Sequence, residues 1–535
     1  MRVLPPEQLL DRLEDRFRLL TGGGRTALER HRTLRAAVDW SYALLSERER
    51  ALFARLAVFA GGWTLEAAEA VGAGEAGEAG EVLDGLTRLA DQSLVEAEEH
   101  PDGEARYRLL ETLRQYATER LEAGGTGRAV RARHAAHFLA LAERAQPEHY
   151  GRAQIAWLDR VEREHDNLRA ALRWFVDAGD AARGTRLALA LRRFWWVRGH
   201  TGEARAWTAA LVGLARRGER RGGGPETLAR ALTGAALFAY LQGDHAALGP
   251  LATEAVALCR RLGDRRTLAE ALHLLGHRYL DPGTDYAAAR AQFEESAAHY
   301  RAVGSDWGLG WSLNCLGLAV WQVGDTAAAR QAFAASARRL RAVGDDNMAA
   351  HPIGDLGLLA FDRGERARGR ALLADSVARF RASGDRRYLA MQLYRSGDVA
   401  CEAGDAGAAL PAYRESLAVA VELGARGQLA DALEGFAMLA AAQAQPERAL
   451  RLAGAAAVLR DATGRHRHPA ERPRLERALA AARAALGAAA PAAWQRGRRM
   501  TAEQAIADAL GDIPDPAGWP SGRTQQKQNT PEVAF

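Results

Sequence analysis

The stretch DWGLGWSLNCLGLAVWQVGDTAAARQAFAASARRLRAVGD, residues 306–345, decides the fold of this 535-residue chain. It holds two apolar segments of helix length, and a glycine follows each of them, Gly324 and Gly344. Glycine takes the left-handed backbone conformation that commonly ends a helix. The stretch therefore predicts a pair of helices with a sharp stop after each.

Glycines recur about every twenty residues through the middle of the chain. They stand at Gly243, Gly263, Gly283, Gly304, Gly324, Gly344, Gly364, Gly384, Gly404 and Gly424. Alternate members are about 40 residues apart, which is typical of arrays built from helix pairs. Such arrays present long concave surfaces and bind partners more often than they transform them. The period therefore predicts a binding scaffold.

Aligned repeats share further positions inside each helix pair. The first helix carries Gly276, Gly317, Gly357 and Gly397 at matching places. The second helix carries Phe293, Phe333, Leu373 and Tyr413, followed three residues later by Ser296, Ser336, Ser376 and Ser416. Small residues let helices approach closely while a large residue fills the space between them. This pattern resembles the tetratricopeptide repeat, with units of about 40 rather than 34 residues.

Residues 1–125 do not follow the repeat and predict a winged helix. Ser46 with Glu49 forms a capping box that begins one helix, and Thr64 caps another. A helix over 81–91 precedes two strands, 93–99 and 105–110. Three helices followed by a hairpin is the order of a winged helix-turn-helix.

The charges of this region argue against direct contact with DNA. The helix that would enter the major groove carries three acids and one arginine, Arg88, and the hairpin is also acidic. Phosphate contacts supply much of the affinity for DNA and require positive charge. We therefore expect this domain to contact protein. The alternative, a DNA-binding regulator, predicts a salt-dependent gel shift that is lost when Arg88 and Arg106 are neutralised.

Segments across 25–125 resemble the winged helix that follows the nucleotide-binding core of NB-ARC (STAND) ATPases. The residues that carry the likeness are DWSYALL at 39–45, LFARLAVF at 52–59, LTRLADQSLV at 86–95 and YRLLETLRQYA at 107–117. HAAHF at 134–138 and EHDNLR at 164–169 resemble the bridging segment of that family. The nearest type is the large bacterial regulators of LuxR type, which place a repeat array after the winged helix and often end in a helix-turn-helix.

The resemblance implies a nucleotide-binding core before residue 1, and we expect the chain to lack it. Leu110 stands where related proteins have a histidine that contacts the nucleotide phosphate, and Glu111 follows it. Leu110, Glu111 and Arg114 are therefore the candidate relay to a nucleotide-binding domain supplied in trans. If the gene begins further upstream, the alternative is a regulatory ATPase.

The residues themselves predict no cofactor and no catalytic activity. The single lysine, Lys527, follows Thr524-Gln525-Gln526, so it does not complete a Walker A loop. No nucleophile or zinc-protease motif occurs, although an enzyme with an unfamiliar site stays open. The net charge is only +5, which argues against a nucleic-acid stripe. The chain has three cysteines and no apolar run of 18 residues, so we expect a cytoplasmic protein with buried thiols.

Aromatic residues suggest where the array binds its effector or protein partner. Phe194, Trp195 and Trp196 are consecutive, so a helix cannot bury all three on one face. Exposed tryptophans beside arginines are typical anchors. The candidate groove comprises Arg192, Trp195, Trp196, Tyr240, Trp307, Trp311, Asn314 and Trp321. The alternative is that these side chains fill wide gaps between helix pairs.

Two histidine pairs raise the question of a metal. His134 and His137, with Glu143 nearby, lack a third ligand at helical spacing, and the loop 465–468 has no supporting cysteine or acid. We expect no metal at either.

We therefore expect an almost all-α chain of five parts: a winged helix (1–125), a helical bridge with a degenerate repeat (126–222), repeats resembling tetratricopeptide repeats (223–465), a helical cap (466–511) and a disordered tail (512–535). The function that this order predicts is non-catalytic signal sensing and protein interaction within a STAND-type transcriptional regulator.

Overall fold

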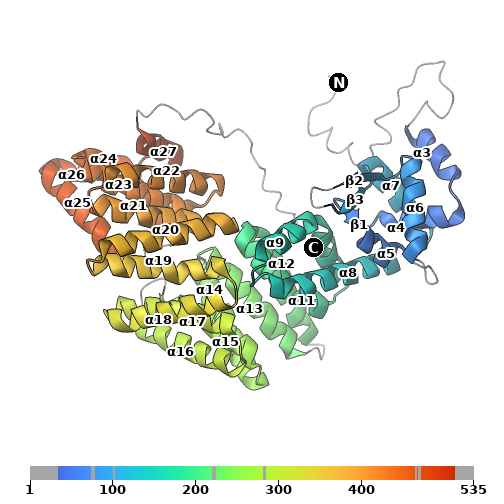
Figure 1. Cartoon of the computed structure of the whole chain (residues 1–535), viewed down its shortest axis with the longest axis horizontal. Helices are drawn as coiled ribbons and strands as arrows, with labels where there is room; N and C mark the ends of the chain where they lie inside the picture. Colours follow the sequence, from blue (N-terminus) through green and yellow to red (C-terminus); the bar gives the residue numbers. More distant parts are fainter. Residues whose placement is uncertain are drawn as a thin grey trace, which may run out of the picture. The chain divides into compact units, whose positions relative to one another are not determined.

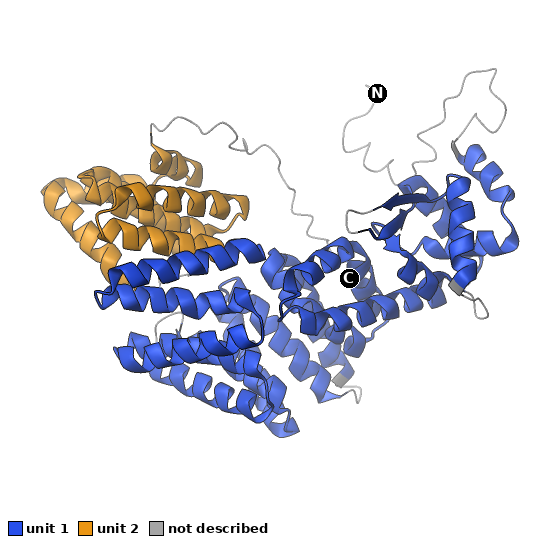
Figure 2. Ribbon diagram, viewed as in Figure 1, with its two compact units in different colours: residues 1–386 blue, residues 387–535 orange. Residues whose placement is uncertain are grey.

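The computed structural model describes residues 34–73, 79–99, 103–219, 224–280, 285–463, 467 and 471–511. Helices dominate these residues beside one small sheet, which confirms the predicted fold class (Figure 1). The chain divides into two compact units, Met1–Arg386 and Arg387–Phe535 (Figure 2). No helix in the described ranges is long and apolar enough to cross a membrane. Lys527 and the tail lie outside the described residues.

The first unit begins with the winged helix. Its elements are α3 (Leu34–Ala43), α4 (Glu47–Leu56), β1 (Trp63–Thr64), α5 (Leu65–Gly72), α6 (Ala79–Asp91), β2 (Glu96–Glu99), β3 (Ala105–Arg108) and α7 (Glu111–Ala123). The capping box at the start of α4 is confirmed, because the Ser46 amide donates to the Glu49 carboxylate at 2.7 Å and the Glu49 amide donates to the Ser46 hydroxyl. The Thr64 cap of α5 is also confirmed.

The sheet has one strand more than the predicted hairpin. The strands lie in the order β1-β3-β2, and all neighbours are antiparallel. Trp63 in β1 pairs with Tyr107 in β3, and the Trp63 side chain is buried. A strand of two residues has no alternation for a sequence pattern to reveal, so β1 was missed.

Helices follow one another through the rest of the first unit. They are α8 (Gly127–Glu148), α9 (Gln154–Arg163), α10 (His165–Asp177), α11 (Ala181–Arg198), α12 (Thr201–Glu219), α13 (Pro225–Leu241), α14 (His245–Leu262), α15 (Arg265–Leu280), α16 (Tyr286–Ala302), α17 (Asp306–Gln322), α18 (Thr326–Ala342), α19 (Asp346–Asp362) and α20 (Arg366–Ser383). From α13 onward they form packed pairs, α13 with α14 through α19 with α20 (Figure 1).

The repeat positions seen in the sequence meet inside each pair. A Cβ atom at Gly317 in α17 would lie 2.5 Å from the Phe333 ring in α18, so only glycine admits the ring there. Gly276 stands in the same relation to Phe293. Nine of the ten periodic glycines are described, and all nine have positive φ. The glycine period therefore marks the helix ends, as predicted.

The second unit contains the last two helix pairs and a helical end. Its elements are α21 (Arg386–Glu402, whose first residue closes the first unit), α22 (Ala406–Glu422), α23 (Arg426–Ala442), α24 (Pro446–Thr463), α25 (Arg472–Leu486), η2 (Gly487–Ala489), α26 (Ala490–Arg498) and α27 (Ala502–Leu510). The domain bounds expected from the sequence stay predictions.

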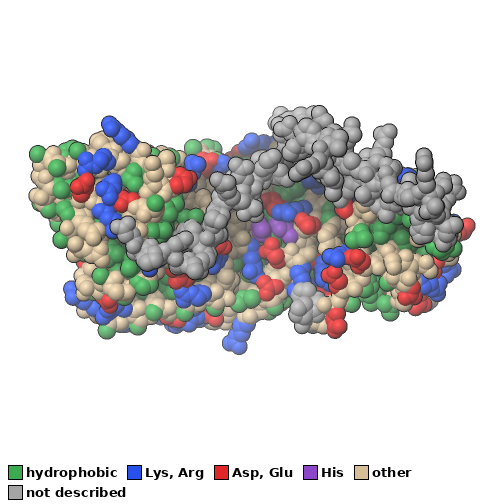
Figure 3. All heavy atoms as spheres, turned by 90° about the horizontal axis from the view of Figure 1, so that it is seen from above, with side chains coloured by type: hydrophobic (Ala, Val, Ile, Leu, Met, Phe, Trp, Pro, Cys, Tyr) green, Lys and Arg blue, Asp and Glu red, His purple; other side chains and the backbone are tan. Residues whose placement is uncertain are grey.

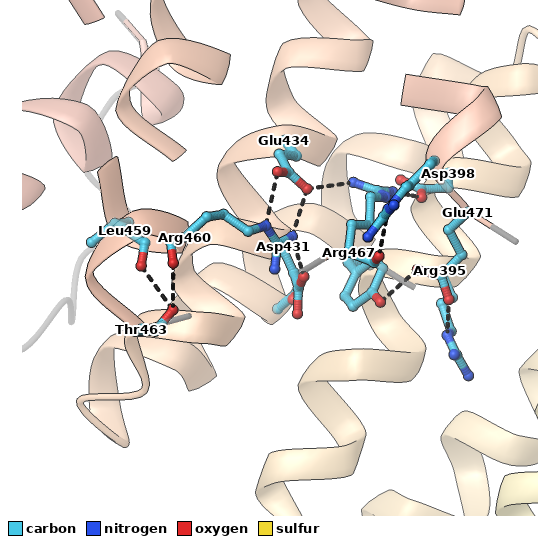
Figure 4. A network of polar contacts seen from close by, with 12 residues as sticks. Arg395, Asp398, Asp431, Glu434, Leu459, Arg460, Thr463, Arg467 and Glu471 are labelled. Atoms are coloured by element: carbon cyan, nitrogen blue, oxygen red, sulfur yellow. Dashed lines mark hydrogen bonds and ion pairs between the residues drawn. The ribbon is translucent and has the colours of Figure 1, made fainter. Parts of the chain in front are cut away.

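Buried ion pairs hold this second unit together (Figure 4). Arg460 on α24 bonds to Asp431 and Glu434 on α23, each with a contact of 2.6 Å. Arg467 pairs with Glu434 and with Asp398 of α21. The three flanking residues of the polar loop, 465, 466 and 468, lie outside the described residues, while Arg467 is 4% exposed. Arg467 therefore serves the interior of the unit, where its guanidinium offsets buried carboxylates.

Candidate functional site

The side chain of Asn167 on α10 joins the winged helix to the bridge. It is fully buried, and its Oδ1 accepts a 2.8 Å hydrogen bond from the Ala60 amide. Its Nδ2 donates to the Gly62 carbonyl and to Glu164 Oε2, both at 2.8 Å. One amide side chain thus bonds to two residues of the loop between α4 and β1. Because buried polar groups are costly when unpaired, this loop and α10 are held to one geometry.

Glu164 extends the junction to the wing. Its carboxylate pairs with Arg106 of β3, and the two side chains are 4% and 14% exposed. Arg106 also donates to the Arg163 carbonyl at 3.4 Å. The arginine that the DNA-binding alternative requires on the wing is therefore occupied within the molecule.

The same α10 segment faces α12 on its other side. Arg169 donates to Glu203 at 3.0 Å, and His165 lies 3.3 Å from the same carboxylate. Burial raises the pKa of Glu203, but hydrogen bonds from His165 and Arg169 outweigh burial and lower it to about 2. Glu203 is therefore ionised at neutral pH. The EHDNLR segment, 164–169, thus contacts the winged helix and α12 at once. We call these residues with Ala60, Gly62, Arg106 and Glu203 the junction.

His134 on α8 packs against the junction. Its Nε2 lies 3.3 Å from Asn167 Oδ1, and its ring packs on Phe59 and Phe138. Because Asn167 Oδ1 only accepts, His134 Nε2 carries the proton. Burial lowers the pKa of His134 to about 4, so its ring is neutral. The contacts support the structural interpretation of the HAAHF motif.

A second cluster of polar contacts lies inside the first unit, around Asp345. This carboxylate caps α19 and is fully buried. It accepts a 2.8 Å hydrogen bond from the Trp307 indole and lies 3.4 Å from the Arg193 guanidinium. Arg193 on α11 also donates to Asn347 at 2.7 Å. The cluster therefore ties α11 to α17 and α19, helices far apart in sequence.

Aromatic rings continue from this cluster. Trp196 contacts Trp311 at 5.9 Å between centroids, Trp311 contacts Trp307 at 5.2 Å, and Trp307 meets Tyr150 at 4.6 Å. Arg193 lies over Trp196 at 4.8 Å. We call Tyr150, Arg193, Trp196, Trp307, Trp311 and Asp345 the aromatic core.

Four of the eight candidate groove residues belong to the aromatic core or join it, and the other four have different neighbours. Trp196, Trp307 and Trp311 belong to the aromatic core, and Arg192 joins it through Tyr150 and an ion pair with Glu270. Tyr240 stacks on His277 at 3.9 Å. The remaining three lie elsewhere: Trp195 against Phe238, Asn314 beside Asp355 and Trp321 against Phe333.

The expectation of exposed tryptophan anchors is wrong for three residues. Trp195, Trp196 and Trp311 are 0%, 4% and 6% exposed. The physical reason is that α11 carries Trp195 and Trp196, and α17 carries Trp311, into the interior of the helix array, where Arg193 lies over Trp196 and pairs with Asp345. Whether the groove residues contact a partner stays a prediction.

The candidate relay residues lie at the start of α7. Leu110 is 47% exposed, and Glu111 pairs with Arg114 at 2.7 Å. An exposed leucine beside a paired acid and base is compatible with a contact surface. Their role stays a prediction.

Three arginines of α4, α6 and the wing are paired with acids. Arg48 pairs with Glu81 at 2.8 Å and Arg88 with Glu49 at 3.0 Å. Arg108 on the wing contacts Glu96 and Glu98. Acidic and basic side chains are interspersed over the face in Figure 3. The ion pairs of Arg48, Arg88 and Arg108 reduce the positive charge that these side chains offer to a phosphate.

Sequence reasoning missed one further cluster. His273 and His277 on α15 and Cys315 on α17 are buried, with their donor atoms all within 4.8 Å of one another. A second group of three in the described ranges is Glu162, His165 and His200. The spacing of His273 and His277, one helical turn, could have signalled the first group.

Comparisons with known proteins agree with this architecture. Residues 45–122 match the family model described as a winged helix-turn-helix domain. A Mycobacterium tuberculosis protein named "Putative HTH-type transcriptional regulator" is 39% identical over 316 residues, 58% of this chain and 35% of the relative. An uncharacterized protein of the same organism is 47% identical over 137 residues, 25% of this chain and 35% of its own length. The chain thus spans about a third of the length of these curated relatives.

A solved structure shares the fold. The signal transduction ATPase with numerous domains (STAND) from Pyrococcus horikoshii, with a tetratricopeptide repeat sensor, gives a TM-score of 0.52 at 13% identity. The match covers 91% of this chain and 70% of that one. This chain therefore combines a winged helix-turn-helix domain with an array similar to tetratricopeptide repeats, and it is similar to proteins named as HTH-type transcriptional regulators.

Proposed function

We propose that this chain is the sensing and relay part of a transcriptional regulator of STAND type. The array binds an effector or a protein partner, and the junction transmits the state of the array to the winged helix. The observation that carries the proposal is Asn167, whose buried amide bonds to the loop between α4 and β1 while its neighbours His165 and Arg169 contact α12. The proposal assigns the chain no catalytic step.

The likeness in fold to the STAND protein supports a nucleotide-binding domain as the partner of the winged helix. The tetratricopeptide repeats of that Pyrococcus protein are described as its sensor. We infer that Leu110, Glu111 and Arg114 face such a domain, in the same polypeptide or in trans. Their exposure on the surface of the winged helix leaves them accessible for this contact.

A double-mutant cycle tests the relay. Trp307→Phe removes the indole N–H that donates to Asp345 and so perturbs the aromatic core. We expect it to change hydrogen-exchange protection of residues 57–64 in the otherwise native chain, but not in an Asn167→Ala background. The interaction free energy between two coupled sites of this kind is about 0.5–2 kcal/mol.

Arg260→Ala is the matched control, because it breaks an exposed ion pair with Glu295 on the array and touches neither site. It should leave residues 57–64 unchanged in both backgrounds. If Trp307→Phe has no effect on residues 57–64 in the native background, the array and winged helix are independent and the relay is wrong.

The match to a winged helix-turn-helix family keeps DNA binding as the second candidate. Fluorescence anisotropy with duplex DNA at low and physiological salt distinguishes the two. We expect no binding at physiological salt, because Arg88 and Arg106 are paired with acids. Salt-dependent binding that is lost in Arg88→Ala would favour the second candidate instead.

A further inference from the structure

Three metal-binding side chains converge inside the first unit, on the first helices of two adjacent repeats. His273 and His277 lie one turn apart on α15, and Cys315 faces them from α17. They are 0%, 3% and 4% exposed. Cys315 Sγ lies 3.8 Å from His273 Nε2 and 3.6 Å from His277 Nε2.

These separations are those of ligands around one small cation. Zinc binds sulfur at about 2.3 Å and imidazole nitrogen at about 2.0–2.1 Å in tetrahedral geometry, which places sulfur and nitrogen about 3.6 Å apart. The two sulfur–nitrogen distances match this value, and the donor atoms of all three residues lie within 4.8 Å of one another. A thiol hydrogen-bonded to an imidazole would also lie at this distance, so the surroundings decide between the two.

A chain of hydrogen bonds orients His273 for metal binding. Ser296 Oγ donates to the Ala269 carbonyl at 2.6 Å, so it accepts from Ser312 Oγ, 2.9 Å away. Ser312 in turn accepts from His273 Nδ1, at 3.3 Å. The proton of the neutral ring is thereby held on Nδ1, and the Nε2 lone pair faces Cys315. Metal-binding histidines use their second nitrogen in this way.

Aromatic rings enclose the three ligands. Trp311 lies 3.7 Å from His273 between centroids, Tyr240 stacks on His277 at 3.9 Å, and Phe293 meets both imidazoles edge-on. One thiolate and two neutral imidazoles together carry a single negative charge. A soft sulfur ligand beside two imidazoles is a donor set that favours Zn²⁺ or Cu⁺.

We propose that His273, His277 and Cys315 bind one thiophilic metal ion, Zn²⁺ or Cu⁺, within the array. The ion would join α15 to α17 and leave a coordination position for a small ligand. This inference does not rest on the proposed function, because metal binding is measured on the isolated chain.

Titration of the reduced, untagged, metal-free chain with Co²⁺ tests the site. We expect one equivalent of Co²⁺ to produce a thiolate-to-cobalt charge-transfer band, and one equivalent of Zn²⁺ to remove it. Cu⁺ buffered by a chelator is the second arm, and its displacement of Zn²⁺ would identify the softer ion as the occupant. Cys315→Ala and His277→Gln should each lose the band.

Matched controls exclude other donors. Cys259→Ala removes a buried thiol on α14 that lies outside the cluster, and His200→Ala disrupts the second group of potential ligands. Both should keep the band and the stoichiometry. Zn²⁺ should also slow alkylation of Cys315 but not of Cys259 in the native chain, a readout that needs no variant to fold. If Co²⁺ gives no thiolate band and Zn²⁺ gives no protection, Cys315 is a hydrogen-bonded core thiol and the proposal is wrong.

Discussion

The hydroxyl of Ser336 on α18 donates a 2.6 Å hydrogen bond to the backbone carbonyl of Gly310 on α17. The same bond recurs in three other repeats, at 2.6–2.8 Å: Ser296 to Ala269, Ser376 to Ala350 and Ser416 to Ala390. All four serines are fully buried. Because the donor and the acceptor belong to different helices, the bond fixes the axial register of one helix against the other.

Replacing Ser336 with alanine should therefore destabilise the first unit by about 1 kcal/mol, the usual contribution of a buried hydrogen bond. Urea unfolding followed by circular dichroism measures the change. Ser396→Ala is the control, since its buried Oγ has no hydrogen-bond partner within the described residues. Removing that hydroxyl should leave stability unchanged or raise it. Equal losses for the two variants would show that the Ser336 bond does not stabilise the pair.

Gly317→Ala should destabilise the array although alanine favours helices. The new Cβ would lie 2.5 Å from the Phe333 ring, and overpacking of this kind costs about 1–3 kcal/mol. Adding Phe333→Leu should recover part of the loss by making room. Gly213→Ala on α12 is the matched control, because the nearest neighbour of its Cβ is a flexible arginine end at 3.7 Å. Helix propensity alone then stabilises that variant, by about 1 kcal/mol. Thermal unfolding of the three variants measures these changes, and a Gly317→Ala variant as stable as the native chain would contradict the expected overpacking.

The sequence revealed the contacts that recur with the repeat and missed those that occur once. Gly317 with Phe333, and Ser336 with its backbone acceptor, repeat about every 40 residues, so their pattern was visible without a structure. The bond between Arg193 and Asp345 joins residues 152 positions apart and occurs once, so no period marks it. Its consequence is that tryptophans expected at the surface lie inside.

The same distinction applies to the junction. The likeness to a bridging segment drew attention to EHDNLR, but no rule of spacing could pair Asn167 with a loop 105 positions earlier. The cluster of His273, His277 and Cys315 was missed for a related reason, because only the two histidines share a helix. Predictions from one sequence therefore reach helix boundaries and repeated packing, and they stop at single contacts between distant elements.

Ala444 occupies the next position of the glycine period, and its φ is +57°. A residue with a Cβ atom is strained there by roughly 1–2 kcal/mol, whereas glycine is not. Ala444→Gly should therefore raise the stability of the second unit by about 1 kcal/mol, despite the greater freedom of glycine in the unfolded chain. The midpoint of urea unfolding should rise, while Ala442→Gly at the end of α23 should lower it. A lower midpoint for Ala444→Gly would mean that the left-handed conformation there is not strained.

Acid should destabilise the first unit well above the pH at which carboxylates titrate. Burial lowers the pKa of His134 to about 4, and burial together with the nearby Arg193 lowers that of His149 to about 4. Since an unfolded histidine titrates near 6.5, the unfolded chain binds more protons between pH 6.5 and 4, and stability falls as pH drops through this window. The expected slope is about 1.4 kcal/mol per pH unit for each histidine. Because the pKa of Glu203 is lowered from 4.5 to about 2, its contribution to stability is lost only as the pH falls below 4.5.

Unfolding midpoints measured from pH 7.5 to 5 check this expectation. His134→Gln keeps a donor for Asn167 and cannot titrate, so its profile should be flatter than that of the native chain. His137→Gln is the less informative neighbour on the same helix, since burial lowers its pKa as well. A native profile that is flat from pH 7.5 to 5 would contradict the buried neutral state of both histidines.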